Sequence, residues 1–247
     1  ALLLALNGGR CENTGTLIVE GIKPLKSNVL DFDEVMENYK KVLHEVARVY
    51  NETMNIIHFM HDKYDYEKSQ MAFIDTDPKI NLAYGVAGLS IVADSLSAIK
   101  HAKVTARRNA DGLTDGFDIE GEFPMFGNDD DRVDVLARDI VQLFDTELRA
   151  RKVYKGAEPT LSLLTITSNV MYGKKTGATP DGRAKGVAFA PGANPMHGRD
   201  THGAIASLSS VAKLDYHDSK DGISNTFSIV PKSLGPTEED KIDNLIT

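Results

Sequence analysis

The sequence predicts an α/β fold in which nearly continuous apolar strands alternate with amphipathic helices. Short runs rich in β-branched and aromatic residues lie between turn residues, which is typical of strands. Longer segments repeat apolar residues at the spacing of three and four that marks a helix face. The chain has 247 residues, 41% of them hydrophobic, and no internal repeat or linker divides it. We therefore expect one domain, or part of one.

The charge and cysteine content exclude several classes of protein. The net charge is −8, from 28 Lys and Arg against 36 Asp and Glu. An acidic chain without a basic stripe argues against nucleic acid and membranes as partners. Cys11 is the single cysteine, which excludes an internal disulfide and fits a reducing compartment. The apolar opening at residues 1–6 is too short for a signal peptide or a membrane span.

Both ends of the chain carry helix signals. Residues 1–6 resemble the last turns of a helix that stops at Asn7-Gly8-Gly9. Near the other end, Thr237 is followed by three acidic residues and begins a helix as its N-cap. This helix meets the last residue, Thr247, after about two turns. We expect residues 1–247 to be a partial domain that is truncated at both ends.

Two long helices are predicted between these ends. Asp31 and Glu34 have the spacing of a capping box, in which each side chain bonds the other residue's backbone N–H. The apolar pattern that follows is helical for about eight turns, through Met60. The second helix begins in the acidic run at residues 128–131 and ends in the basic run at residues 149–152, which suits the helix dipole.

Four segments have strand character. Residues 82–92 are predicted to form a buried strand that passes into a helix over residues 91–99. Residues 117–123 alternate apolar and polar side chains and predict a half-exposed strand. Residues 161–167 and 225–230 are short runs rich in β-branched residues and predict two further strands.

His58, His61 and Asp62 are a candidate metal site, because spacings of three and four place side chains on one helix face. A third ligand at a recognisable spacing is missing, whereas zinc sites need three or four. We expect structural residues near a helix end, and we assign no metal.

Three further candidates involve Cys11 and two glycine segments. Cys11 follows a glycine turn, but no histidine partner is indicated, so a structural thiol is expected. Residues 173–176 (GKKT) resemble the tail of a phosphate loop, but Ser168 stands where that loop needs glycine, and the match fails. Residues 85–88 (GVAG) precede a helix and suit either a phosphate cradle or close helix–strand packing, which is commoner. No catalytic or cofactor-binding residue is assigned.

Six segments carry a resemblance to a known family. Their order and spacing are kept from end to end, so the resemblance covers essentially all 247 residues. The segments are NIIHFMHDKYDYE (55–67), GVAGLSIVADSLSAIKHAKV (85–104), EGEFPMFGNDD (120–130), LLTITSNVMYGKKTGATPDGR (163–183), PGANPMHGRD (191–200) and DGISNTFSIVPKSLG (221–235). The chain resembles the pyruvate formate-lyase (formate acetyltransferase) family of glycyl radical enzymes.

The resemblance implies a ten-stranded α/β barrel made of two five-stranded halves, in a cytoplasmic homodimer. It implies an acyltransferase of pyruvate metabolism and anaerobic fermentation that converts pyruvate and coenzyme A to acetyl-CoA and formate. A radical-SAM activating enzyme makes the stored glycyl radical, which passes to one of two adjacent cysteines, while the other carries the acetyl group. Apart from this radical and coenzyme A as co-substrate, no permanently bound cofactor is implied.

No catalytic residue is carried over by motif. The family places the cysteine pair and the substrate arginines ahead of Ala1, and the radical motif RVSGYAVRF after Thr247, so the isolated chain is expected to be inactive. Ile74 stands where many members have the histidine of MALHD, and isoleucine cannot transfer protons. Two alternatives stay open: another glycyl radical enzyme (a 2-ketobutyrate formate-lyase or a diol or glycerol dehydratase), or a scaffold fragment without chemistry.

Residues 179–203 contain five glycines and three prolines and have almost no apolar period. Loops of this length are usually functional or disordered. We expect an ordered structural loop rather than a catalytic one. Charge-assisted hydrogen bonds from Arg183, Arg199, Asp181 and Asp200 would hold it against the core.

Overall fold

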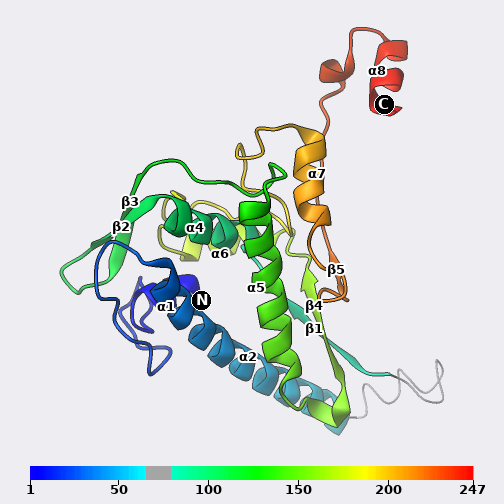
Figure 1. Cartoon of the computed structure of the whole chain (residues 1–247). Helices are drawn as coiled ribbons and strands as arrows, with labels where there is room; N and C mark the ends of the chain where they lie inside the picture. The colour runs from blue at the N-terminus through cyan, green and yellow to red at the C-terminus, as the bar shows by residue number, and fades with distance from the viewer. Residues whose placement is uncertain (65–78, 247) are drawn as a thin grey trace.

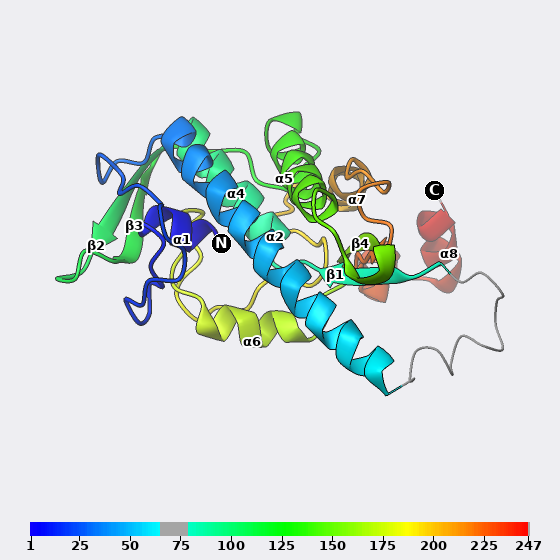
Figure 2. The same cartoon turned by 90° about the horizontal axis from the view of Figure 1, so that it is seen from below.

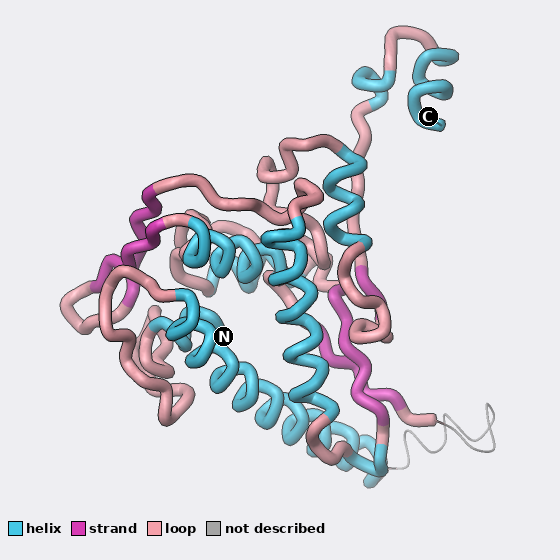
Figure 3. The backbone as a smooth tube through the Cα atoms, in the orientation of Figure 1, coloured by secondary structure: helices cyan, strands magenta, loops and turns pink. Residues whose placement is uncertain are grey.

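The computed structural model describes residues 1–64 and 79–246, and its strands form two separate sheets (Figure 1). The larger sheet is parallel, with the order β1-β4-β5. These strands are β1 (Asn81–Gly85), β4 (Glu158–Leu163) and β5 (Gly222–Ile223). The smaller sheet is an antiparallel hairpin of β2 (Lys103–Arg108) and β3 (Thr114–Glu120), which lies at the opposite side of the molecule (Figure 3).

Helices cover the parallel sheet. Helix α2 runs diagonally through the view of Figure 2, and α4 and α5 pack beside it. Helix α8 lies beside the short helix η2 and apart from the other helices (Figure 1). In chain order the helices are α1 (Leu2–Leu6), α2 (Phe32–Lys63), α4 (Leu89–His101), α5 (Asp131–Arg149), η1 (Tyr154–Gly156), α6 (Ser168–Lys175), α7 (Ala204–Ala212), η2 (Pro231–Leu234) and α8 (Glu238–Ile246).

The core lies between the parallel sheet and helices α2, α4 and α5. Its largest fully buried side chains include Tyr84 and Leu161 of the sheet and Leu96 and Leu148 of the helices. Burying an aliphatic side chain of this size contributes about 1.5–3 kcal/mol. The register pairs Ala83 with Thr160 and Gly85 with Ser162, so the carboxyl ends of β1 and β4 meet at one edge of the sheet.

The predicted α/β class and the predicted long helices are confirmed. Helix α2 extends three residues beyond the predicted end at Met60, and α5 begins at the predicted acidic run, where Asp130 accepts a hydrogen bond from the Arg132 N–H. Gly8 and Gly9 have φ angles of 59° and 81° just after α1, which is the expected stop. Thr237 accepts a bond from the Asp240 N–H and caps α8 as predicted.

Half of the predicted capping box is wrong. Asp31 accepts a hydrogen bond from the Glu34 N–H at 2.9 Å, as expected. The Glu34 side chain, however, accepts from the Lys26 N–H instead of the Asp31 N–H. The loop before the helix folds back beside its first turn, so the N–H of Lys26 takes the place of the local partner.

Two predicted strands differ from the structure because their backbone groups form hydrogen bonds outside the sheet. The strand predicted over residues 161–167 ends at Leu163, after which the Thr165 carbonyl accepts from the Gly192 N–H in a loop. Residues 225–230 are not a strand. There the amide side chain of Asn194 bonds both the N–H and the carbonyl of Thr226, so these groups are not available to a sheet.

The strand predicted over residues 117–123 is displaced toward the N-terminus, because β3 ends before Gly121, whose φ is 103°. The pattern also missed β2, α6 and α7. Strand β2 carries three basic residues among six, and its alternation is short. Among the residues that the structure describes, no helix is both long and apolar enough to cross a bilayer.

Helix α6 packs unusually close to the chain at residues 187–188, and Gly173 permits the contact. A Cβ atom at Gly173 would lie 2.3 Å from the Val187 carbonyl oxygen and 2.6 Å from Ala188 Cα. Backbone atoms cannot yield as a flexible side chain can. This explains the glycine in the GKKT segment by packing, without a phosphate.

We predict that Gly173→Ala destabilises the full-length protein by about 1–3 kcal/mol, because the new methyl group must push two backbone segments apart. Thermal and denaturant unfolding would measure the loss. Gly85→Ala is the matched control: its Cβ would meet nothing closer than Ser162 Oγ at 3.8 Å. If Gly173→Ala were as stable as the control, the packing explanation would be wrong.

Candidate functional site

The candidate site is a cleft at the carboxyl ends of β1 and β4, the edge at which open parallel sheets commonly bind ligands. The turn at residues 85–88 joins β1 to α4 there. Three adjoining hollows surround this turn, and Ala87 lines all of them. The predicted glycine turn therefore lies at the centre of the cleft.

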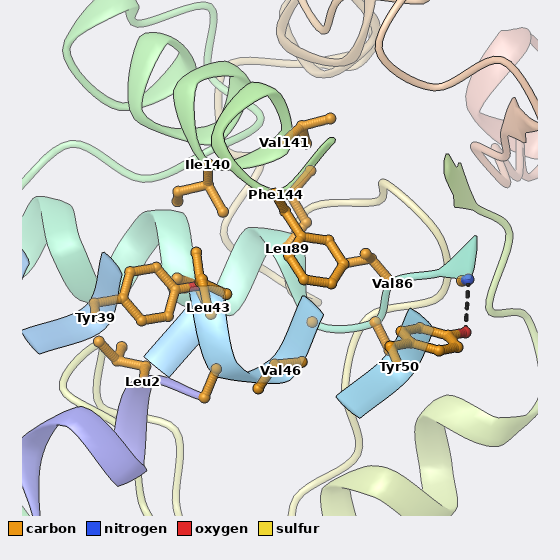
Figure 4. A pocket seen from close by; sticks show the side chains of 15 residues that line it. Leu2, Tyr39, Leu43, Val46, Tyr50, Val86, Leu89, Ile140, Val141 and Phe144 are labelled. Carbon is orange, nitrogen blue, oxygen red and sulfur yellow. Dashed lines mark hydrogen bonds between the residues drawn. The ribbon is translucent and has the colours of Figure 1, made fainter. Parts of the chain in front are cut away.

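The first hollow is apolar, with a volume of about 220 Å³ (Figure 4). Helices α2 and α5 and the start of α4 enclose it with side chains such as Leu43, Val46, Ile140 and Phe144. A hollow with this lining offers water few hydrogen-bond partners. It suits an apolar group rather than a charged one.

The two wider hollows are more polar and have volumes of about 440 and 480 Å³. Lys175 and Thr176, at the end of α6, line both. Cys11 and Glu12 line the larger one. The structure thus brings Cys11, the GKKT segment and the glycine turn, which are far apart in the sequence, to one cleft.

Tyr50 and Tyr84 pack against each other beside the turn at residues 85–88. The Tyr50 and Tyr84 rings meet edge to face with centroids 4.8 Å apart. The Tyr84 hydroxyl donates to Asn51, whose side-chain amide donates to the Leu148 carbonyl. Burial raises the pKa of Tyr84 to about 12, with a smaller contribution from Tyr50, so Tyr84 stays a neutral donor.

Half of the amides of the glycine turn are already bonded within the protein. The Gly85 N–H donates to the Tyr50 hydroxyl at 3.1 Å, the bond drawn in Figure 4, and the Val86 N–H donates to the Ser162 carbonyl at 2.9 Å. Gly88 has a φ of 81°, and a Cβ there would lie 3.2 Å from the Phe189 ring. These contacts favour the packing role over the phosphate cradle.

Cys11 is partly exposed at the rim of the cleft. Its pKa is lowered, chiefly by a hydrogen bond from the Thr14 side chain, while partial burial acts in the opposite direction. Its backbone forms a tight turn, in which the Gly15 N–H donates to the Cys11 carbonyl. The thiol is thus more acidic than an ordinary cysteine thiol. That Cys11 has a structural role stays a prediction.

His58, His61 and Asp62 lie at the end of α2, away from the cleft. The two imidazole rings are 6.2 Å apart. Asp62 accepts a hydrogen bond from the Tyr154 hydroxyl and pairs with Lys155, so it holds η1 against the helix. Within the described ranges 1–64 and 79–246, no three His, Cys, Asp or Glu side chains are grouped to hold a metal ion.

Arg183 organises the first part of the loop at residues 179–203. Its guanidinium is buried and donates to the carbonyls of Thr176, Gly177, Ala184 and Val187. Arg183 makes two more contacts within the loop. Its Nε donates to the Thr179 hydroxyl, and its guanidinium carbon lies 5.1 Å from the centroid of the Phe189 ring. A planar guanidinium has five N–H donors in a fixed arrangement, so it can join several carbonyls at once, which a lysine ammonium group could not do.

Arg199 fastens the second part of the loop to α4. Its Nη1 donates to Asp94 and to Asp181, each at 2.6 Å, and Nη2 donates to the Asp181 carbonyl. The expected fastening to the core is therefore confirmed for Arg199 and Asp181, whereas the bonds of Arg183 stay within residues 176–187. Asp200 contributes less: it is exposed and accepts one long hydrogen bond, at 3.4 Å, from the Ser207 hydroxyl of α7.

Sequence reasoning missed Asp94, Tyr50 and Asn51. Asp94 is the single acidic residue of α4, a helix that is otherwise nearly all apolar or hydroxylated and mostly buried. A lone acid in such a setting signals a buried partner, and this signal was available in the sequence. Nothing comparable distinguishes Tyr50 or Asn51. Ile74 lies outside the described residues.

Solved structures share this fold. The chain superimposes on a Roseburia inulinivorans structure concerned with 1,2-propanediol dehydration with a TM-score of 0.80 at 24% identity, over 99% of this chain and 34% of that one. For a glycyl radical enzyme from Archaeoglobus fulgidus the TM-score is 0.79 at 20% identity, over 99% of this chain and 34% of that one. For the B12-independent glycerol dehydratase of Clostridium butyricum the TM-score is 0.72 at 23% identity, over 90% of this chain and 31% of that one. The chain therefore has part of the barrel fold of the glycyl radical enzymes.

Sequence comparison gives the family. The pyruvate formate lyase-like family matches residues 1–173, and the glycine radical family matches residues 189–247. Formate acetyltransferase 1 of Escherichia coli (strain K12) is 54% identical over 244 residues, which are 99% of this chain and 32% of that protein. The chain belongs to the pyruvate formate lyase-like family, and it spans about a third of the length of this relative.

We predict that Arg183→Lys loosens the loop, because an ammonium group cannot reach the carbonyls that the guanidinium joins. The expected cost in the full-length protein is about 2 kcal/mol or more, from buried carbonyls left unpaired. Limited proteolysis at residues 176–187 and unfolding would measure it. Arg107→Lys, at an exposed arginine paired with Asp118, is the control and should change neither measurement. Equal proteolysis of the two variants would refute the role of Arg183.

Proposed function

We propose that the full-length protein containing this segment is a formate C-acetyltransferase, which converts pyruvate and coenzyme A to acetyl-CoA and formate. The observation that carries the proposal is the 54% identity to Escherichia coli formate acetyltransferase 1 along nearly the whole chain. This identity is more than twice that to the dehydratases of the same fold, which are 23% and 24% identical.

The segment contributes structure rather than the reacting groups. The reaction type needs a radical cysteine and an adjacent cysteine for the acetyl group, whereas this sequence has Cys11 alone. Residues 1–247 then act as a partial barrel domain, with the parallel sheet and the loop at residues 179–203 forming part of the wall around the reaction. The isolated chain is inactive on this proposal.

The partners follow from the same proposal. A radical-SAM enzyme generates the glycyl radical, which fits the match to the glycine radical family at residues 189–247. Coenzyme A is the co-substrate, and the protein is a cytoplasmic homodimer of anaerobic pyruvate fermentation. These finer statements rest on the family relationship.

A diol or glycerol dehydratase is the second candidate, and the shared fold supports it. That support comes from structures at 20–24% identity, a level at which the fold is shared among different activities. A 2-ketobutyrate formate-lyase differs only in the substrate side chain. A direct assay separates the three.

The test uses the full-length protein, activated anaerobically with a radical-SAM activating enzyme, S-adenosylmethionine and a reductant. We expect a glycyl radical doublet by electron paramagnetic resonance, and formate and acetyl-CoA from pyruvate and coenzyme A. Faster turnover of 2-ketobutyrate would reassign the substrate. Conversion of glycerol or 1,2-propanediol to an aldehyde, without formate from pyruvate, would replace the proposal with the dehydratase.

Cys11→Ser in the full-length enzyme should leave pyruvate–formate exchange within about threefold, because a partly exposed small side chain is exchanged for one of similar size. Exchange of labelled formate into pyruvate measures the effect. A loss of a hundredfold or more with the fold intact would make Cys11 a reacting thiol and overturn its structural assignment.

A further inference from the structure

The apolar hollow between α2, α4 and α5 contains a buried hydroxyl, that of Tyr39. The Tyr39 side chain lines the hollow and is 3% exposed. Figure 4 shows the hydroxyl end of its ring directed toward Leu43 and the other lining side chains, with no hydrogen bond to any of them. Burial alone raises its pKa, since no hydrogen bond or charge in the described part of the chain acts on it. The hydroxyl is therefore a neutral donor that faces the hollow.

A buried hydroxyl without a partner is costly, because it has given up its hydrogen bonds to water. The neighbouring tyrosines avoid this cost. Tyr50 accepts a hydrogen bond from the Gly85 N–H at 3.1 Å, and Tyr84 donates to Asn51. A phenylalanine in place of Tyr39 would fill the same space without a polar group. The hydroxyl itself thus points to a hydrogen-bond acceptor that enters the hollow.

The lining defines the chemistry of what fits. The described residues around the hollow carry no charged side chain, and most of them are apolar. An ion would lose its hydration there without gaining a counterion, so a neutral molecule is favoured. The volume of about 220 Å³ exceeds the roughly 150 Å³ of an apolar cavity that binds benzene. A compact molecule slightly larger than benzene therefore fits, with one polar atom placed against Tyr39.

We propose that this hollow is a binding site for a small, neutral and largely apolar molecule with one hydrogen-bond acceptor, such as a ketone or ether oxygen. The Tyr39 hydroxyl donates to that acceptor and thereby fixes the orientation of the molecule. The apolar side chains of α2, α4 and α5 supply the remaining contacts. A concave apolar site with a single directing polar group is the usual design of a small-molecule pocket.

A molecule bound there contacts three helices at once. Leu43 of α2, Leu89 of α4 and Ile140 of α5 all line the hollow. A ligand that binds the folded protein and not the unfolded chain stabilises the folded protein by mass action. Binding therefore raises the unfolding temperature of the full-length protein, whatever reaction that protein catalyses.

Two probes of nearly the same shape separate the hydrogen bond from the apolar contacts. Cyclohexanone carries an acceptor oxygen, whereas methylenecyclohexane has a CH₂ group in its place. Saturation-transfer NMR titrations of the full-length protein give a dissociation constant for each probe. We expect both probes to bind the wild type. We expect Tyr39→Phe to weaken cyclohexanone relative to methylenecyclohexane by about two- to tenfold, the contribution of one neutral hydrogen bond.

Tyr216→Phe is the matched control, because Tyr216 is 55% exposed and should leave the ratio of the two constants unchanged. Ile140→Trp fills the hollow and should abolish binding of both probes. If that variant does not fold, the ratio in Tyr39→Phe still decides. An unchanged ratio in Tyr39→Phe would overturn the proposal. So would a wild type that binds neither probe, the result expected if a side chain from outside residues 1–247 fills the hollow.

Discussion

The enclosure of α4 constrains the structure around it. Most of its 13 residues are buried, including the polar Asp94, Ser95 and Ser97. Buried polar groups need partners, and neighbouring segments provide them: the Pro124 carbonyl accepts from Ser97, and Asp181 from Ser95. Residues 124–126 and 179–199 therefore take fixed positions although neither segment has regular secondary structure over most of its length. The glycine turn before α4 is held by α2 and β4, through the bonds of Gly85 to Tyr50 and of Val86 to Ser162.

Local periodicity was sufficient to predict the long helices and the α/β class. Helices α2 and α5 each present one continuous apolar face, which tertiary contacts reinforce. Strands were harder to predict, because the pairing of their backbones depends on residues that are distant in the sequence. Residues 225–230 have strand composition, yet the Asn194 side chain takes the backbone groups of Thr226. Strand β2 has too many charged residues to show its period, and it is a strand because it pairs with β3.

The candidate site was predictable in its parts but not as a whole. Cys11, the turn at residues 85–88 and Lys175 were each considered separately, and only contacts between distant segments bring them around one cleft, such as the bond from Asn13 to the Lys175 carbonyl. The Val86 amide bonds Ser162 because β1 is paired with β4, and the Gly85 amide bonds Tyr50 of α2. A sequence pattern records which groups are present, whereas their availability to a ligand depends on contacts made across the fold.

The long loop over α4 also bears on how fast the protein folds. The ion pair between Arg199 and Asp94 joins residues 105 positions apart, and the bond between Asn13 and Lys175 joins residues 162 apart. Closing such loops costs chain entropy before the contacts can form, so high contact order slows folding. Since residues 179–203 have no helix or strand of their own, we expect their bonds to α4 and to the sheet to form after those elements, although Arg183 can join residues 176–187 locally. Until this loop docks, Ile91 of α4 lacks the cover that Ala190 and Met196 provide, so we expect this apolar spot to stay open to other chains during folding.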